Sequence, residues 1–146
     1  MKKIISMLLL LIVTSTSYQV LAAENDKPFA EEKVVLQISD ADPFKQTLVL
    51  NVANNLIKHY GQDKVEIEIV AFGPGLRLLF KDNVNSGRID GLNASGAPFA
   101  ACQNTVAAIT KTLGHPPVLT NNATPVPHGP VRLIDFIKEG LQLVKT

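Results

Sequence analysis

Short apolar runs alternate with helical segments along this chain, and this alternation constrains its fold more than any other feature. The runs are rich in valine, isoleucine, leucine or alanine and occupy residues 33–39, 65–72, 97–101, 123–126 and 141–145. Runs of this length and composition are typical of strands buried in a parallel sheet. Helical patterns lie between them, at residues 43–60, 76–80, 82–96, 103–113 and a stretch that ends at Gly140. The sequence therefore predicts an α/β fold, in which helices cover both faces of a mostly parallel sheet.

The first helical segment has clear signals for its start and its end. Asp42 is a favourable N-cap, Pro43 suits the first helical position, and Gly61 favours termination. The spacing of its apolar residues predicts one buried stripe, made of Leu48, Val49, Val52, Ala53, Leu56, Ile57 and Tyr60.

The second strand and the last helix carry mixed patterns. Glu66 and Glu68 alternate with apolar residues at the start of the strand, so we expect both carboxylates to face water. The apolar residues of the last helix are Leu133, Ile134 and Ile137.

The N-terminus has the three parts of a secretory signal peptide. Lys2 and Lys3 form a basic start, residues 4–13 are almost wholly apolar, and a small-residue cleavage site ends at Ala22. This apolar run is too short to cross a hydrocarbon core of about 30 Å, which disfavours an uncleaved membrane anchor. We therefore expect export to the periplasm, with a signal peptide at 1–22, a flexible N-terminal arm at 23–32 and a single domain at 33–146.

The charge of the exported chain excludes some classes of partner. Removal of Lys2 and Lys3 from the 14 basic residues leaves 12 against 13 acidic residues, a net charge of about −1. The chain has no basic run and no tryptophan. This composition disfavours binding to nucleic acid, and to a membrane once the signal peptide is removed.

The single cysteine, Cys102, lies where an apolar run ends and a helix begins. Free N–H groups and the helix dipole stabilise a thiolate there, and they lower the pKa of a cysteine from its usual value near 8.5. The Thr105 hydroxyl adds a further donor, and His128 is a candidate proton carrier if its turn lies nearby. The alternative is that Cys102 is a small buried residue with no chemistry.

Ligands of parallel α/β sheets bind at the carboxyl ends of the strands. Four turns are expected at that edge, at Ser39-Asp40, Gly73-Pro74-Gly75, Cys102 and His128-Gly129. We therefore predict one crevice whose candidate ligand-binding residues are Gly73, Gly75, Asn104, Thr105 and His128.

The sequence gives no sign of a cofactor or a metal. The Gly73-Pro74-Gly75 turn lacks both the third glycine of a dinucleotide fingerprint and the lysine of a P-loop. The three histidines do not have the spacing of metal ligands. We therefore expect neither a cofactor nor a metal ion.

Three segments in order resemble the exported branch of the DsrE/DsrF-like family of small sulfur-relay proteins. They are AFGPGLRLLFKD at 71–82, APFAACQNT at 97–105 and PHGPVRLIDFIKEGLQLVK at 127–145, and the resemblance spans nearly the whole domain. It implies a three-layer α/β/α fold with a five-stranded parallel sheet, and a homotrimer or homohexamer. In cytoplasmic members a cysteine at the junction between this strand and the following helix carries sulfur as a persulfide, and Cys102 matches that position. The Pro116-Pro117 loop departs from those members, and an exported copy is separated from their relay partners.

Three hypotheses follow for the function. The first is a periplasmic sulfur carrier or sulfur-transfer protein with Cys102 as nucleophile, which exchanges sulfur with a donor or acceptor protein. The second is a non-catalytic oligomeric module that binds a small ligand at the same edge, with Cys102 as a packing residue. The third is a structural assembly protein without a ligand.

Overall fold

The computed structural model describes residues 27–146, so the predicted signal peptide and the first residues of the arm lie outside the described part of the chain. The strands are β1 (Glu32–Ile38), β2 (Val65–Ala71), β3 (Phe99–Cys102), β4 (Ala123–Val126) and β5 (Gln142–Lys145). The helices are α1 (Pro43–Tyr60), the 3₁₀ helix η1 (Gly73–Leu79), α2 (Ser86–Ala94), α3 (Gln103–Leu113) and α4 (Gly129–Lys138). Each of them lies within a few residues of a predicted element.

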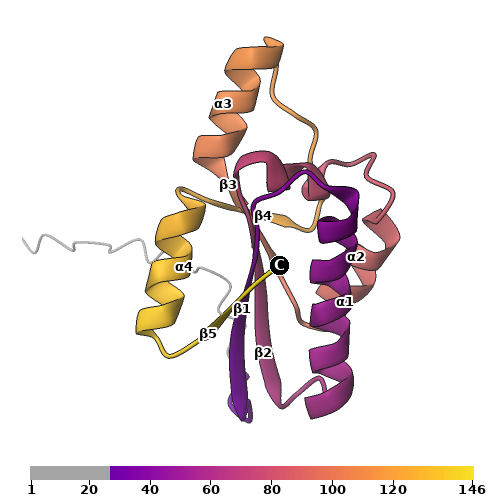
Figure 1. The fold of residues 1–146 in the computed structure, drawn as a ribbon, viewed down its shortest axis with the longest axis vertical. Coiled ribbons are helices and arrows are strands. Elements are labelled where there is room, and N and C mark those ends of the chain that lie inside the picture. Colours follow the sequence, from indigo (N-terminus) through magenta and orange to yellow (C-terminus); the bar gives the residue numbers. More distant parts are fainter. Residues whose placement is uncertain (1–26) are drawn as a thin grey trace, which may run out of the picture.

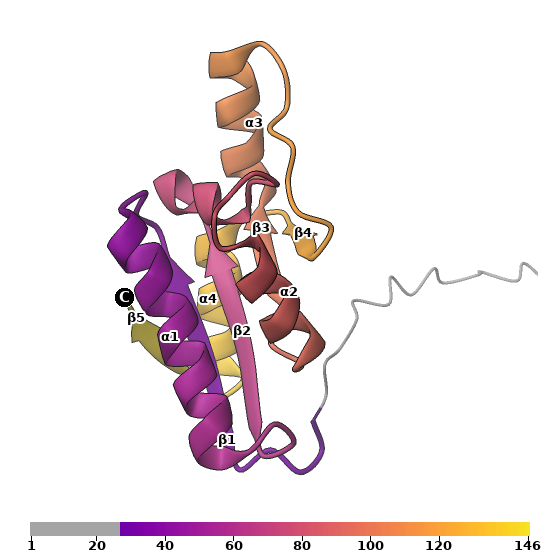
Figure 2. The same ribbon diagram turned by 90° about the vertical axis from the view of Figure 1, so that its right-hand side faces the viewer.

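The five strands form one sheet in the order β4-β3-β2-β1-β5, and every neighbouring pair is parallel. α1 and α2 cover one face of the sheet and α4 covers the other, whereas α3 extends beyond the end of the strands (Figure 1, Figure 2). This arrangement confirms the predicted three-layer α/β/α fold with a parallel sheet of five strands.

The two faces of the sheet are covered unequally. The larger core lies between the sheet and α1 and α2, where Leu36, Ile38, Ile67 and Ile69 are almost completely buried. The smaller core, on the side of α4, consists of Val35, Val70, Ala100, Leu133, Phe136 and Leu141. The α4 layer therefore packs on a smaller apolar core than the layer of α1 and α2.

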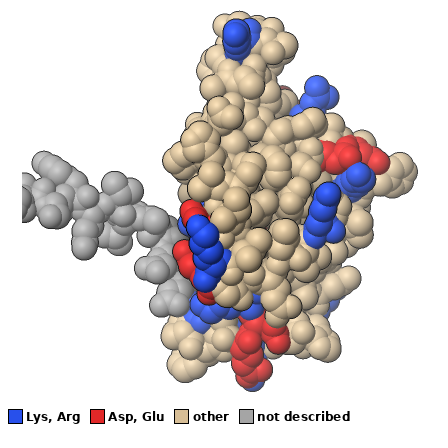
Figure 3. All heavy atoms as spheres, turned by 60° about the vertical axis from the view of Figure 1, so that its left-hand side comes forward, with Lys and Arg blue, Asp and Glu red and all other residues tan. Residues whose placement is uncertain are grey.

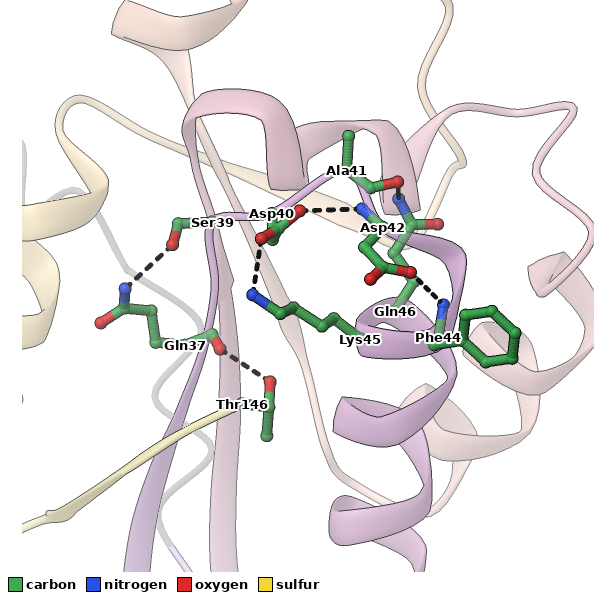
Figure 4. A network of polar contacts seen from close by, with 9 residues as sticks. All are labelled: Gln37, Ser39, Asp40, Ala41, Asp42, Phe44, Lys45, Gln46 and Thr146. Carbon is green, nitrogen blue, oxygen red and sulfur yellow. Dashed lines mark hydrogen bonds and ion pairs between the residues drawn. The ribbon is translucent and has the colours of Figure 1, made fainter.

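The start of α1 agrees with the predicted signals. Asp42 Oδ1 accepts the N–H of Phe44 at 2.8 Å, and Asp40 Oδ1 accepts the N–H of Asp42 at 2.9 Å (Figure 4). Pro43 occupies the first helical position, and Gly61 ends the helix with a φ of 97°. These contacts confirm Asp42 as the N-cap.

The buried stripes of two helices differ from the apolar pattern of the sequence. In α1, Leu48 is 47% exposed whereas Leu50 is fully buried, because this helix contacts both the sheet and α2. The predicted stripe is therefore wrong at Leu48. In α4, Leu133 and Phe136 face the sheet, while Ile134 and Ile137 are about half exposed.

Glu66 and Glu68 do not face water, which contradicts the prediction. They point to the α4 side of β2, a strand whose two faces are both covered because α1 contacts one face and α4 the other. Their side chains are only 19% and 13% exposed, and they pair with Lys33 at 2.9 Å and with Arg132 at 2.9 Å. The alternation of charged and apolar residues in this strand predicts a solvated face. The ion pairs with Lys33 and Arg132 allow the two carboxylates to be buried instead.

The described end of the predicted flexible arm makes specific contacts with the domain. Lys27 Nζ donates to the carbonyl oxygens of Gln62 at 2.7 Å and Val65 at 3.0 Å. Glu31 forms an ion pair with Lys64, and its N–H donates to the Lys64 carbonyl at 2.8 Å. Residues 27–31 are therefore anchored to the turn before β2.

Apolar side chains are exposed on α4 and β5. Figure 3 views the side of the molecule that carries α4, and large areas of that face have no charged side chain. The exposed apolar residues of these two elements are Val131, Ile134, Ile137, Leu143 and Val144. Within residues 27–146, no helix combines the length and the apolar character needed to cross a membrane.

The Gly75→Ala substitution should destabilise the protein strongly. A Cβ at Gly75 would lie 2.6 Å from the carbonyl carbon of Ile38 and 2.7 Å from the Cα of Ser39, and neither backbone atom can move aside easily. We expect a loss of about 1–3 kcal/mol or more in the free energy of unfolding, measured by denaturant titration.

The matched control is Gly87→Ala in α2, where a Cβ would meet nothing within 4 Å. Alanine should stabilise this helical position slightly, by about 0.5–1 kcal/mol. Equal effects of the two substitutions would contradict the close backbone contact at Gly75.

Candidate functional site

The four predicted turns meet at the carboxyl ends of the strands. Gly75 lies against the backbone of Ile38 and Ser39 at the end of β1. Gly73 follows β2, and its N–H donates to Thr105 Oγ1 at 2.9 Å. These contacts join the ends of β1, β2 and β3, as expected for a parallel sheet.

The turn before α4 completes the same edge. The Asn104 N–H donates to the Pro127 carbonyl at 3.2 Å. Gly129 packs so closely on Phe72 that a Cβ at Gly129 would lie 2.9 Å from the Phe72 Cβ. The turn that holds His128 and Gly129 therefore lies beside the start of α3.

Cys102 occupies the predicted step between strand and helix. It is the last residue of β3, pairs in register with Val126 of β4, and is the N-cap of α3 with φ −64° and ψ 113°. The residue is only 2% exposed. The thiol therefore does not face an open crevice.

Polar groups surround the covered thiol. Burial raises the pKa of Cys102, but the Thr105 hydroxyl and the N–H groups of Gly129, Thr105 and Asn104 act in the opposite direction, and the pKa is lowered overall. None of these N–H groups makes a standard capping hydrogen bond to the sulfur of Cys102. They lower the pKa of the thiol as several dipoles that lie near the sulfur. This environment favours the thiolate and differs from the apolar surroundings of an inert cysteine.

Thr105 links the thiol to the turn after β2. Its oxygen accepts the N–H of Gly73, which leaves the hydroxyl proton available to the sulfur of Cys102. Gly73 has a φ of 54°, a left-handed conformation that glycine adopts without strain. The Gly73 backbone therefore orients the hydroxyl that stabilises the thiolate.

The remaining predicted site residues have different positions. Gly75 is buried and serves close packing, whereas the Asn104 side chain is exposed and only its backbone N–H is near the thiol. His128 is the exposed N-cap of α4, and its ring makes no hydrogen bond or ion pair to any residue in the range 27–146. Sequence reasoning placed Gly129 in the right turn but did not identify its N–H as a neighbour of the thiol.

A groove between η1 and α3 adjoins the thiol environment. Its volume is about 460 Å³, and it begins at Gly73 and Thr105. Its other lining residues are Pro74, Arg77, Phe80, Ala108, Ile109, Thr112 and Leu113. No local sequence pattern predicts this groove, because it forms between segments separated by about 30 residues. In the described part of the chain, no three His, Cys, Asp or Glu side chains gather as metal ligands would.

Comparisons with known proteins support the fold alone. No protein-family model matches this chain, and no curated protein matches it. The structure is similar to MTH1491 from Methanobacterium thermoautotrophicum, with a TM-score of 0.71 and 26% sequence identity over 80% of this chain and 100% of that one. It is also similar to BT1422 from Bacteroides thetaiotaomicron, with a TM-score of 0.51 and 19% identity over 79% and 95% of the two chains. Both are described as proteins of unknown function.

The Thr105→Val substitution should raise the pKa of the Cys102 thiol, because it removes the hydroxyl and keeps the shape of the side chain. The ultraviolet absorbance of the thiolate, followed against pH, reports this thiol alone, since the chain has one cysteine. The titration should move to higher pH in Thr105→Val and stay near that of the natural protein in Thr105→Ser, which keeps a hydroxyl. Identical titrations of all three proteins would contradict a role for the hydroxyl.

Proposed function

We propose that this chain is a periplasmic DsrE/DsrF-like protein that carries sulfur on Cys102. One observation supports this more than any other: the thiol lies at the start of α3 among a hydroxyl and three N–H groups, and its pKa is lowered in spite of burial. A thiolate is the nucleophile in sulfur exchange. The resemblance in residues 71–82, 97–105 and 127–145 adds the expectation that the transferred group is a sulfane sulfur.

The proposed step transfers one sulfur atom from a persulfide donor. The Cys102 thiolate attacks the outer sulfur of a donor R–S–SH, and a new S–S bond forms at Cys102. The bond between the two sulfur atoms of the donor breaks, and the donor leaves as the thiolate R–S⁻, which takes a proton from water. The product is the persulfide of Cys102, and no separate oxidant or reductant is needed.

The covered position of Cys102 limits the donor. Since the residue is 2% exposed, the outer sulfur of a donor reaches it only after the side chains around the turn at residues 127–129 move. Asn104 at the start of α3 and His128 in the turn before α4 are both exposed, and their side chains can move without loss of core packing. A donor with a slender persulfide end therefore fits this site better than a bulky one.

The exposed apolar side chains of α4 and β5 support assembly into a homo-oligomer. Val131, Ile134 and Ile137 on α4 are each about half exposed, and Leu143 and Val144 extend this surface onto β5. Apolar surface of this kind is typical of interfaces between subunits. We propose a trimer or hexamer, which sedimentation of the protein without its signal peptide would measure.

Mass spectrometry of the folded protein after exposure to polysulfide tests the sulfur carrier. We expect the mass to rise by one sulfur atom, and a thiol reductant to remove it. Cys102→Ser should gain no sulfur, and Thr105→Val should gain it more slowly. An unmodified natural protein under conditions that convert a free cysteine peptide to its persulfide would exclude the proposed function.

The groove between η1 and α3 favours a second candidate function, a module that binds a small apolar ligand. Its volume of about 460 Å³ lies within the range of pockets for drug-sized ligands. Ala108 lines the groove and is exposed, whereas Ala107 is also exposed but does not line it.

The fluorescent probe anilinonaphthalene sulfonate distinguishes this second function. If the groove binds apolar molecules, Ala108→Phe should lower the probe fluorescence, while Ala107→Phe and Cys102→Ser should keep it. Equal fluorescence of the two phenylalanine variants would exclude the groove as a ligand site.

A further inference from the structure

A partly buried ion pair joins α4 to the middle of the sheet. Arg132 Nε lies 3.1 Å from Glu68 Oε1, and a terminal nitrogen of Arg132 lies 2.9 Å from Glu68 Oε2. The guanidinium also lies 3.9 Å from the ring centroid of Phe136. Two parallel hydrogen bonds fix the orientation of the partners as well as their distance. This pair therefore determines how α4 is placed on β2.

The first turn of α4 runs from this ion pair to the thiol. The Arg132 N–H donates to the His128 carbonyl at 3.0 Å and so closes that turn. Gly129 begins the helix and packs directly on Phe72. The Asn104 N–H donates to the carbonyl of Pro127 at 3.2 Å, which places this turn beside Cys102, and the Gly129 N–H acts to lower the pKa of the thiol. A single helical turn thus has the ion pair at one end and the thiol at the other.

We propose that Glu68 and Arg132 are positioning residues, whose ion pair holds the first turn of α4 so that the N–H of Gly129 faces Cys102. The biological purpose of this arrangement rests on the proposed function. The arrangement itself can be measured without any sulfur donor, because it changes the ionisation of the thiol.

A purely stabilising role explains this ion pair less well. Burial raises the pKa of Glu68 in spite of the hydrogen bonds and the charge of Arg132, so the carboxylate is costly to bury. Glu66 from β2 and Glu139, the C-cap of α4, repel the Glu68 carboxylate, while Asp135 of α4 attracts the Arg132 guanidinium. Apolar residues of similar size often replace such pairs without loss of stability. An apolar replacement would lose the two parallel hydrogen bonds, and with them the defined direction of the contact between α4 and β2.

The decisive variant replaces the pair by apolar residues, Glu68→Leu with Arg132→Met. It should unfold cooperatively at a temperature close to that of the natural protein. Alkylation of Cys102 at pH 6 should nevertheless be slower by roughly two- to tenfold, the effect of one hydrogen-bond donor moved away from the thiolate. Arg132→Lys keeps the charge but cannot form two parallel hydrogen bonds with Glu68. Its alkylation rate should therefore lie between those of the natural protein and the double variant.

Glu66→Gln is the matched control. Glu66 lies on the same strand and the same face as Glu68, and it pairs with Lys33 instead of α4. Its alkylation rate should equal that of the natural protein. A folded double variant whose thiol reacts and titrates like that of the natural protein would overturn the proposal.

A measurement on the natural protein keeps the proposal testable if the double variant does not fold. The amide resonance of Gly129 should shift with pH in step with the ionisation of Cys102, and this shift should shrink in Arg132→Lys. A Gly129 resonance that does not respond to the thiol would also overturn the proposal.

The two proposals fail in different ways. If the alkylation rate of Cys102 depends on Arg132 but the thiol accepts no sulfur from polysulfide, the sulfur carrier is excluded and the positioning role stands. A thiol that accepts sulfur equally fast in the natural protein and in the folded double variant would exclude the positioning role alone.

Discussion

Close backbone contact between the ends of parallel strands is the constraint on which this structure depends. At Gly75 and at Gly129 there is no room for even one additional carbon atom, because the backbone of Ile38 and Ser39 and the side chain of Phe72 fill the space. These two contacts bring the turns after β1, β2 and β4 close to the start of α3. The environment of Cys102 is a result of that closeness, since its polar neighbours combine the N–H of Gly129, which follows β4, with the N–H groups of Asn104 and Thr105 at the start of α3.

The two layers of helices are held to the sheet by different forces. The layer of α1 and α2 rests on a large apolar core, in which many side chains are completely buried. The α4 layer has a small apolar core and depends in addition on an ion pair with β2. Apolar contacts tolerate small shifts, whereas paired hydrogen bonds define a distance and a direction. It is notable that the layer with the directional contact is the one that reaches the thiol.

The sequence predicts the fold well because strand and helix periods are local properties. Apolar runs identified all five strands, and Asp42 with Pro43 identified the start of α1. Errors arose where burial depends on the neighbours in space. Glu66 and Glu68 alternate like a solvated strand, yet α4 and its arginine cover that face. Leu48 was assigned to the core because the helical pattern does not reveal that α1 must also contact α2.

The candidate site was predictable in position but not in detail. The strand-to-helix step placed Cys102 at a helix start, and the turn residues indicated which loops would lie nearby. The cover over the sulfur, the Gly73–Thr105 hydrogen bond and the contact with Gly129 depend on distances between turns of widely separated segments. No local pattern of residues contains that information. His128 shows the opposite error, because its residue type suggested chemistry while its ring is exposed and without a partner in residues 27–146.

The cover over Cys102 has a consequence for a protein with a single thiol. Without a second cysteine the chain cannot form an internal disulfide, so a disulfide at this position could only join it to another molecule. Formation of such a bond needs a second sulfur to approach in line with the first, which bulky thiol oxidants cannot do while the turns are closed. Small sulfur species meet less steric hindrance on their approach to the buried thiol. The burial of Cys102 therefore favours small sulfur species over bulky thiol oxidants as reaction partners.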